Sequence, residues 1–380
     1  MTDGKNTLHQ LLEQGQSPWI DNITRDMLQD GTLRRLVDVG IVGLTSNPTI
    51  FQKAIAKSTS YDEELQTLTR QNKSVQEIFD DLVLDDIGNA ADVLRPVYDR
   101  MNGGDGFVSI EVPPNLSADT EATIQEVRRL FNYLARPNVF VKVPGTPEGI
   151  PAFQKAISEG ININVTLLFS LESYRKVAEA YLAGLEQRAS NGQPIDGIAS
   201  VASFFVSRVD TAVDKKLDAM IGEAGNESRK SELQALKGKA AIANAKMAYE
   251  AFKEIFSGSR WEALAAKGAR VQRCLWASTS TKNPDYRDVV YVEQLIGPDT
   301  VDTMPDATID VFLDHGKVER TLDRDVDTAR KELQALENVG ISMDEVTHQL
   351  QVDGVKSFTD SFNEMLETIN SKREQMLATA

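Results

Sequence analysis

Short apolar runs typical of β-strands alternate with longer segments of helical periodicity through most of this chain. The runs with strand character are 17–21, 41–47, 106–112, 138–143, 161–168, 197–204, 270–278 and 299–305. Helical patterns separate them, as in 147–160, where Pro147 opens the segment and Gly160 closes it. Because strict alternation of strand and helix is typical of a parallel sheet covered by helices, eight such strands predict a single closed (β/α)8 TIM barrel, an α/β fold.

Two connections are longer than one crossover helix requires. Segment 52–105 holds at least two helical patterns, and segment 205–269 holds at least three. No linker rich in Pro, Ser or Gly brackets either segment, so we expect one domain over 1–380 with helical insertions at about 52–105 and 205–269. Helices are also expected at about 323–380, where apolar residues recur at helical spacing: Val355, Phe358, Phe362, Leu366 and Ile369.

Charge and composition exclude several classes of function. The net charge of −16 argues against binding to nucleic acid or to an anionic membrane surface, both of which require a basic field. No apolar run approaches the roughly 20 residues that span a bilayer. A small anionic substrate remains compatible, because a few cationic side chains in a cleft act locally while distant acidic charges are screened.

Cysteine and histidine usage bears on compartment and on metals. A single cysteine, Cys274, excludes an internal disulfide, and no leader-like apolar segment opens the chain, so we expect a reducing cytoplasmic location. The three histidines, His9, His315 and His348, are scattered, which argues against a histidine-rich metal site. An all-oxygen magnesium site stays open at this point.

One lysine interrupts the strand 138–143. Val139, Val141 and Val143 share one face of that strand, and Phe140 and Lys142 share the other. Burial in an apolar strand favours the neutral amine, which is the form that attacks a carbonyl to give a Schiff base. The alternative is a lysine that protects an edge strand from aggregation. A closed barrel has no edge strand, so the barrel prediction favours the chemical interpretation.

Polar side chains stand at the carboxyl ends of most predicted strands, where a barrel carries its site. They are Asp21, Asn47, Glu111, Lys142, Asn164, Thr166, Ser203 and Ser278. Two separated carboxylates, Asp21 and Glu111, can move protons in a Schiff-base aldol cycle, and Thr166 can orient a water between them. Taken singly, each carboxylate can equally cap the helix or turn that follows. Arg208 can hold a phosphate, or it can pair with Asp210 or Asp214 on the surface.

Four segments together resemble the transaldolase family. They are "GIVGLTSNPTIF" at 40–51, "NVFVKVPGT" at 138–146, "INVTLLFS" at 163–170 and "SFFVSRVD" at 203–210, and they occur in that family's order and at compatible spacing. The resemblance extends from Asp21 to about Met304, and the length is similar to the longer bacterial type.

The resemblance implies a cofactor-free barrel enzyme of the pentose phosphate pathway. Such an enzyme transfers a dihydroxyacetone unit from sedoheptulose 7-phosphate to glyceraldehyde 3-phosphate, giving erythrose 4-phosphate and fructose 6-phosphate. By position, the resemblance implies that Lys142 forms the Schiff base and that Asp21 accepts the C4 hydroxyl proton. Glu111 and Thr166 then act through a catalytic water. The residues implied to bind the sugar are Asn47, Asn164 and Ser203, with Arg208 on the phosphate.

The chain departs from the shorter members of this family after Ser278. They carry a phosphate-binding arginine two residues later, where this chain has Ser280, and Lys282 is the nearest basic candidate to replace it. The partners implied are phosphorylated sugars, and no oligomeric state follows from the sequence. Alternatives are a related Schiff-base aldolase that releases free dihydroxyacetone, a metal-dependent aldolase, or a non-catalytic sugar-phosphate-binding barrel. The C-terminal helix is a candidate lid, because transfer requires that water be kept from the intermediate.

Overall fold

The computed structural model describes residues 5–378, and its centre is a parallel sheet. The seven strands are β1 (Gln16–Ile20), β2 (Val108–Glu111), β3 (Val139–Pro144), β4 (Ile163–Leu168), β5 (Ser200–Phe205), β6 (Arg273–Ala277) and β7 (Thr300–Met304). Their order is β1-β7-β6-β5-β4-β3-β2, so the two edge strands are β1 and β2. The predicted span 1–380 and the helical range 323–380 include residues 1–4 and 379–380, which lie outside the described residues.

An eighth, much shorter strand segment at Leu44 closes the sheet into the predicted barrel. Leu44 forms parallel bridges to Ile20 of β1 and to Val108 of β2. The predicted strand 41–47 was therefore too long, because Asn47 already caps the next helix. Glycine is required at position 43, next to this segment, since a Cβ there would lie 2.3 Å from the ring of Trp19.

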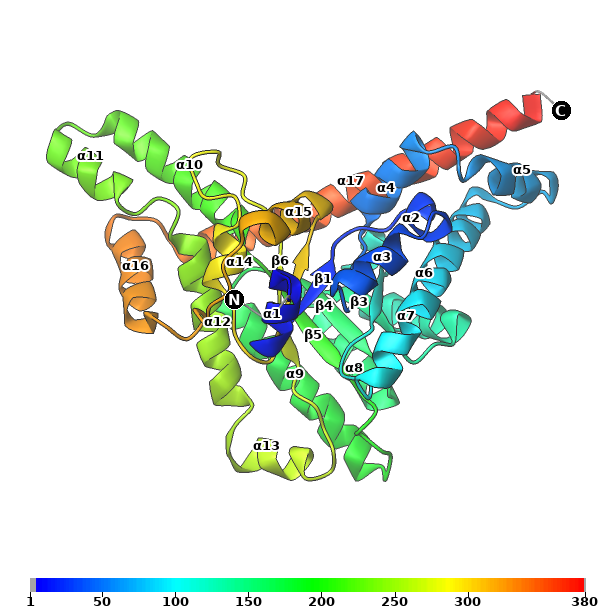
Figure 1. The fold of residues 1–380 in the computed structure, drawn as a ribbon, viewed down its shortest axis with the longest axis horizontal. Coiled ribbons are helices and arrows are strands. Elements are labelled where there is room, and N and C mark those ends of the chain that lie inside the picture. The colour runs from blue at the N-terminus through cyan, green and yellow to red at the C-terminus, as the bar shows by residue number, and fades with distance from the viewer. Residues whose placement is uncertain (1–4, 379–380) are drawn as a thin grey trace.

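The helices cover the outside of the barrel and extend beyond it (Figure 1). The helices in the first half are α1 (Thr7–Glu13), α2 (Arg25–Gln29), α3 (Thr32–Val39), α4 (Pro48–Lys57), α5 (Asp62–Arg70), α6 (Val75–Arg100), the 3-10 helix η1 (Pro114–Leu116), α7 (Thr120–Leu134), α8 (Gly149–Glu159) and α9 (Leu171–Ser190). The remaining helices are α10 (Ser207–Glu223), α11 (Glu227–Gln234), α12 (Ala240–Ile255), α13 (Gly258–Ala265), α14 (Val290–Gln294), α15 (Asp306–His315), α16 (Val326–Asn338) and α17 (Met343–Ala378).

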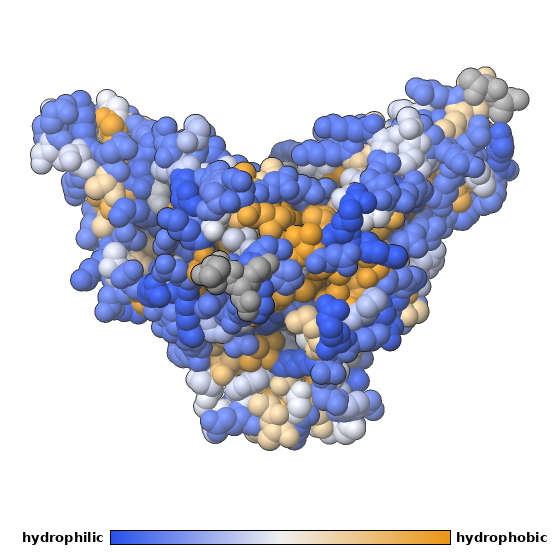
Figure 2. Space-filling view, in the orientation of Figure 1, coloured by the Kyte–Doolittle hydropathy of each residue, from blue (hydrophilic) through white to orange (hydrophobic). Residues whose placement is uncertain are grey.

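Two groups of helices project from the barrel as arms. One is formed by α10 with α11, and the other by α4 and α5 beside the far end of α17 (Figure 1). Figure 2 shows that both arms are mainly hydrophilic on this face and that apolar residues gather at its centre, below the notch between them. None of the helices in residues 5–378 is long and apolar enough to cross a membrane.

The C-terminal helix α17 packs across the barrel. It contacts α4, α5, α6, α10 and β4, which brings the last part of the chain to elements from the first two thirds. Phe358, Phe362 and Ile369 of the predicted apolar stripe are buried, and Phe362 packs edge-on against Phe79 of α6. The helix begins at Met343, well before the predicted stripe, so it is longer than the stripe alone indicates.

The barrel interior has an aromatic layer beneath a polar one. Trp19, Phe107 and Phe140 stack on one another inside the barrel and are buried. Because side chains alternate along a strand, residues two positions further along β1 and β3 point into the same interior. Those residues are Asp21 and Lys142, so the aromatic layer forms the floor beneath the polar groups.

Candidate active site

A cavity of about 300 Å³ opens at the carboxyl ends of the strands. Its lining includes eight of the ten predicted site residues: Asp21, Asn47, Lys142, Thr166, Ser203, Arg208, Ser278 and Lys282. Glu111 and Asn164 do not line it, but each contacts a residue that does: Glu111 lies beside Lys142, and Asn164 accepts from Ser203. The ends of the strands thus bring together residues that are up to 261 positions apart, from Asp21 to Lys282.

Lys142 is buried on an interior strand, which excludes the edge-strand interpretation. β3 lies between β2 and β4, and Lys142 is paired with Glu111 on one side and Asn164 on the other. Only 4% of the residue is exposed. Its amine donates a 2.9 Å hydrogen bond to the carbonyl oxygen of Ser46 and lies 3.4 Å from Oε2 of Glu111. The amine is therefore held by one neutral acceptor and one long charged contact.

Glu111 is buried beside this amine with an oxygen that is poorly satisfied. Its Oε2 accepts no hydrogen bond from residues 5–378 apart from the 3.4 Å contact with Lys142. Burial raises the pKa of Glu111 to about 7, and the nearby Lys142 opposes that rise. A carboxyl that titrates near neutrality can both give and take a proton, as general acid–base catalysis requires.

Asp21 lies at the end of β1 and does not cap the following helix. Thr24 is the N-cap of α2, whereas Asp21 accepts a 2.7 Å hydrogen bond from the hydroxyl of Thr45. That hydroxyl also lies 2.6 Å from Oγ1 of Thr303. Burial raises the pKa of Asp21, and Lys142 opposes that rise. The capping alternative is thus contradicted for Asp21.

A chain of hydrogen bonds links side chains of β5, β4 and β2 beside Lys142. Ser203 donates to Oδ1 of Asn164 at 2.7 Å, and Nδ2 of Asn164 donates to the hydroxyl of Ser109 at 3.2 Å. Thr166, on the same strand as Asn164, is fully buried, and its hydroxyl has no hydrogen-bond partner within the described part of the chain. Buried hydroxyls are usually paired, so Thr166 is left available to a substrate or a water in the cavity.

Cationic side chains gather on one wall of the cavity. Arg208 stacks over the ring of Phe205, and burial lowers its pKa. Its predicted surface partners are occupied elsewhere, because Asp210 accepts from Tyr291 and Asp214 accepts from Tyr286. The surface-pair alternative for Arg208 is therefore wrong.

Lys282 lies on the same wall and donates a 2.7 Å hydrogen bond to Ser280. Its pKa is lowered by burial and then by the charges of Arg208 and Lys53. Lys53 of α4 is a lining residue that the sequence did not single out, because it lies within a helix and belongs to no strand-end motif. Three mutually repelling cations in one cavity are typical of a site for an anionic group.

The two remaining predicted residues have structural contacts that fix their positions. Asn47 caps α4 by accepting from the backbone N–H of Ile50 at 3.1 Å. Ser278 has a φ of 58°, a left-handed conformation, and its hydroxyl lies 2.9 Å from that of Ser207. Among residues 5–378 no cluster of three or more His, Cys, Asp or Glu side chains could hold a metal ion.

The fold and the site define a barrel protein with a buried lysine in a cation-lined cavity at its carboxyl face. The family described as "Transaldolase/Fructose-6-phosphate aldolase" matches residues 18–369. The chain is 46% identical to "Transaldolase" of Trichodesmium erythraeum, with 98% of each chain covered. It is 47% identical to "Transaldolase 2" of Nostoc sp., with 97% of each covered. It is 48% identical to "Transaldolase" of Thermobifida fusca, over 95% of this chain and 97% of that one. The chain belongs to the transaldolase/fructose-6-phosphate aldolase family.

Proposed function

We propose that this protein is a transaldolase that works through an imine on Lys142. It transfers a dihydroxyacetone unit from sedoheptulose 7-phosphate to glyceraldehyde 3-phosphate, a step of the non-oxidative pentose phosphate pathway. The observation that carries the proposal is the amine of Lys142, which is buried beside Glu111 in the cation-lined cavity. A location in the reducing cytoplasm is part of the proposal and is supported by the free, buried thiol of Cys274.

The first half of the reaction forms the imine and breaks a carbon–carbon bond. The neutral amine of Lys142 attacks the C2 ketone of the donor, and the carbinolamine loses water to give the imine. Glu111, with its pKa near 7, and the hydroxyl of Thr166 serve the proton transfers of this dehydration through one water. Asp21 then takes the proton of the C4 hydroxyl, the C3–C4 bond breaks, and the aldose phosphate leaves. A three-carbon enamine remains on the lysine.

The second half repeats these steps in reverse with the acceptor aldehyde. The enamine carbon attacks the aldehyde, Asp21 returns its proton to the new hydroxyl, and water releases the ketose phosphate from Lys142. Both substrates carry a phosphate, for which Arg208 and Lys282 are the proposed ligands, with Lys53 on the same wall. No metal or organic cofactor is needed for this cycle.

The sugar backbone and the intermediate require further contacts. We assign these contacts to Asn47, Ser203 and Ser278, which line the cavity, and to Asn164, which orients Ser203 from behind. Helix α17 contributes Ser357 and Phe358 to the lining and serves as the cover that keeps water from the enamine.

Borohydride trapping with fructose 6-phosphate tests the proposal directly. Reduction is expected to leave a sugar-derived adduct on the Lys142 peptide, identified by mass spectrometry. Adding or omitting the acceptor aldehyde then separates transfer from release, because a transaldolase holds the enamine until the acceptor arrives. Steady release of dihydroxyacetone without acceptor would indicate an aldolase instead. Folded protein that binds the sugar but forms no adduct would indicate a binding barrel.

A further inference from the structure

A single side chain of α17 joins the ends of the two strands that carry Lys142 and Thr166. Nε2 of Gln351 donates to the carbonyl oxygen of Gly145 at 3.0 Å and to that of Leu167 at 3.2 Å. Gly145 follows directly after β3, three residues beyond Lys142, and Leu167 is the residue after Thr166. The amide of Gln351 thus lies between two backbone positions adjacent to the proposed chemistry.

The backbone at this junction is unusual and needs external support. Leu167 has a φ of 59°, which is left-handed and rare for a residue that is not glycine. The pairing of β4 with β5 shifts register between Val165 and Leu168, so this part of the strand is a bulge. Such backbone positions persist only where the surroundings fix them.

The helix is shaped to reach the bulge. Gln351, Gly354 and Phe358 lie on one face of α17, since residues three, four and seven apart share a face. A Cβ on Gly354 would lie 3.0 Å from Cδ2 of Leu167, so glycine lets the helix pack closely there. The backbone N–H of Gly145 also donates to the carbonyl of Thr166 at 2.8 Å. Three backbone carbonyls and one backbone N–H therefore couple α17 to the ends of β3 and β4 next to Thr166.

We propose that Gln351 is a positioning residue for the reaction: it holds the β4 bulge so that the Thr166 hydroxyl faces the water used at Lys142. Gln351 lines a separate outer cavity rather than the one that holds Lys142, and it acts through the two carbonyls. This inference rests on the proposed function, because it assumes proton transfer through Thr166 at an imine on Lys142. It goes beyond the cover role of α17, which excludes water without aligning any group.

The test compares Gln351→Leu with Gln349→Leu. The second variant is a matched control, because Gln349 is an exposed glutamine of the same helix whose side chain donates to Asp353, one turn further along that helix. Gln351→Leu is expected to lower kcat by up to about 10-fold, no more than removal of the Thr166 hydroxyl itself, with KM for the donor changed less than about twofold, because misplacement of a proton relay slows the reaction without loosening the substrate. Gln349→Leu is expected to match the unchanged protein.

A conservative variant separates positioning from simple stability. Gln351→Glu keeps the shape of the side chain, but its carboxyl donates a hydrogen bond only when protonated. Its kcat, relative to that of Gln351→Leu, is therefore expected to rise as pH falls. Parallel pH profiles for the two variants, or a kcat loss equalled by Gln349→Leu, would overturn the proposal.

Borohydride trapping distinguishes failure of the imine mechanism from failure of the positioning role of Gln351. If the unchanged protein forms the Lys142 adduct but Gln351→Leu has normal kcat, only the positioning role fails. If the unchanged protein forms no adduct, the imine mechanism itself fails.

Discussion

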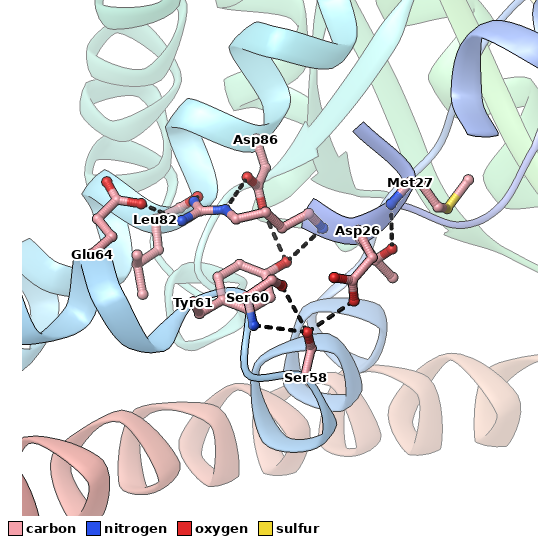
Figure 3. Close-up of polar contacts among 10 residues, drawn as sticks. Asp26, Met27, Ser58, Ser60, Tyr61, Glu64, Leu82 and Asp86 are labelled. Carbon is pink, nitrogen blue, oxygen red and sulfur yellow. Dashed lines mark hydrogen bonds and ion pairs between the residues drawn. The ribbon is translucent and has the colours of Figure 1, made fainter. Parts of the chain in front are cut away.

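Two buried ion pairs in this molecule differ in how completely their atoms are satisfied. In the first, Arg25 of α2 bonds Asp86 of α6 at 2.9 Å. The other oxygen of Asp86 accepts from Tyr61 at 2.9 Å, and Figure 3 shows these two residues side by side with Glu64 and Leu82 nearby. Arg25 also bonds Glu64 and the carbonyl of Leu82. In the second, Lys142 and Glu111 meet at 3.4 Å, and Glu111 has no shorter bond from the described residues at that oxygen.

The difference separates a structural pair from the pair that we propose to be reactive. Burial costs free energy for any charge, and the Arg25 cluster offsets that cost with hydrogen bonds to nearly every polar atom. The Lys142 pair leaves donors and acceptors unused, and a substrate carbonyl or water can engage them. Unsatisfied polar atoms point to chemistry only where they also lie at the cavity, as at Thr166, because Thr69 lacks a partner too and does not line it.

Replacing the lysine of the reactive pair has the largest expected effect. Lys142→Met is expected to lower transfer activity about 10⁴-fold or more, because the other two lysines of the cavity, Lys53 and Lys282, lie on the wall proposed to bind the phosphate. Activity is measured in the coupled transfer assay, and the adduct should disappear from trapping. Lys246→Met is the matched control, since Lys246 is also buried with its amine on a backbone carbonyl. Normal activity of Lys142→Met would refute the imine.

Breaking the structural pair should affect stability instead. Asp86→Ala leaves the Arg25 charge buried with the Glu64 carboxylate, the Leu82 carbonyl and the Tyr61 ring as partners, which is expected to lower the free energy of unfolding by about 3 kcal/mol. Urea unfolding measures this change, and kcat of the folded fraction should stay within about threefold. A large kcat loss at unchanged stability would show that this pair belongs to the site after all.

Removing the charge of Glu111 tests the acid–base role. Glu111→Gln is expected to lower kcat roughly 10²-fold and to abolish the ionisation near pH 7 in the pH profile. The raised pKa of Glu111 also makes the stability of the protein depend on pH. The pKa is 4.5 ordinarily and about 7 in the folded protein, so the free energy of unfolding should fall as pH rises from about 4.5 to 7. If Glu111→Gln still shows the ionisation near pH 7 in kcat and the same fall in stability with pH, another group is responsible for both.

Among the substitutions at Lys142, Glu111 and Thr166, removal of the unpaired Thr166 hydroxyl is expected to lower kcat least. Thr166→Val keeps the shape of the side chain and removes only the hydroxyl, so stability should be unchanged or slightly higher. We expect kcat to fall about 10-fold while the yield of trapped imine at equilibrium stays the same. Thr69→Val is a control, because Thr69 is a second buried threonine whose hydroxyl lacks a partner in residues 5–378. Equal kcat for both variants would remove Thr166 from the mechanism.

The fold was largely predictable because each strand and helix of the barrel has a recognisable local pattern of apolar residues. All eight strand positions were found, and the error at 41–47 arose because a strand pattern does not show where Asn47 starts the next helix. The positions of Lys142, Asp21 and Glu111 follow from strand parity and strand ends. Lys53 and Gln351 were not predictable in this way. Each lies on a helix, and its role depends on where that helix packs, which no local pattern specifies.

The packing of α17 on β4 also has a consequence for the order in which the molecule is made. A ribosome synthesises every strand of the barrel before it reaches Gln351, and domains begin to fold from the N-terminal side during synthesis. The strands can therefore pair before α17 is available to fix the bulge at Leu167. With the role proposed for Gln351, the barrel is assembled first and its reaction centre is completed last, so a nascent chain whose strands have paired is expected to be inactive until α17 docks.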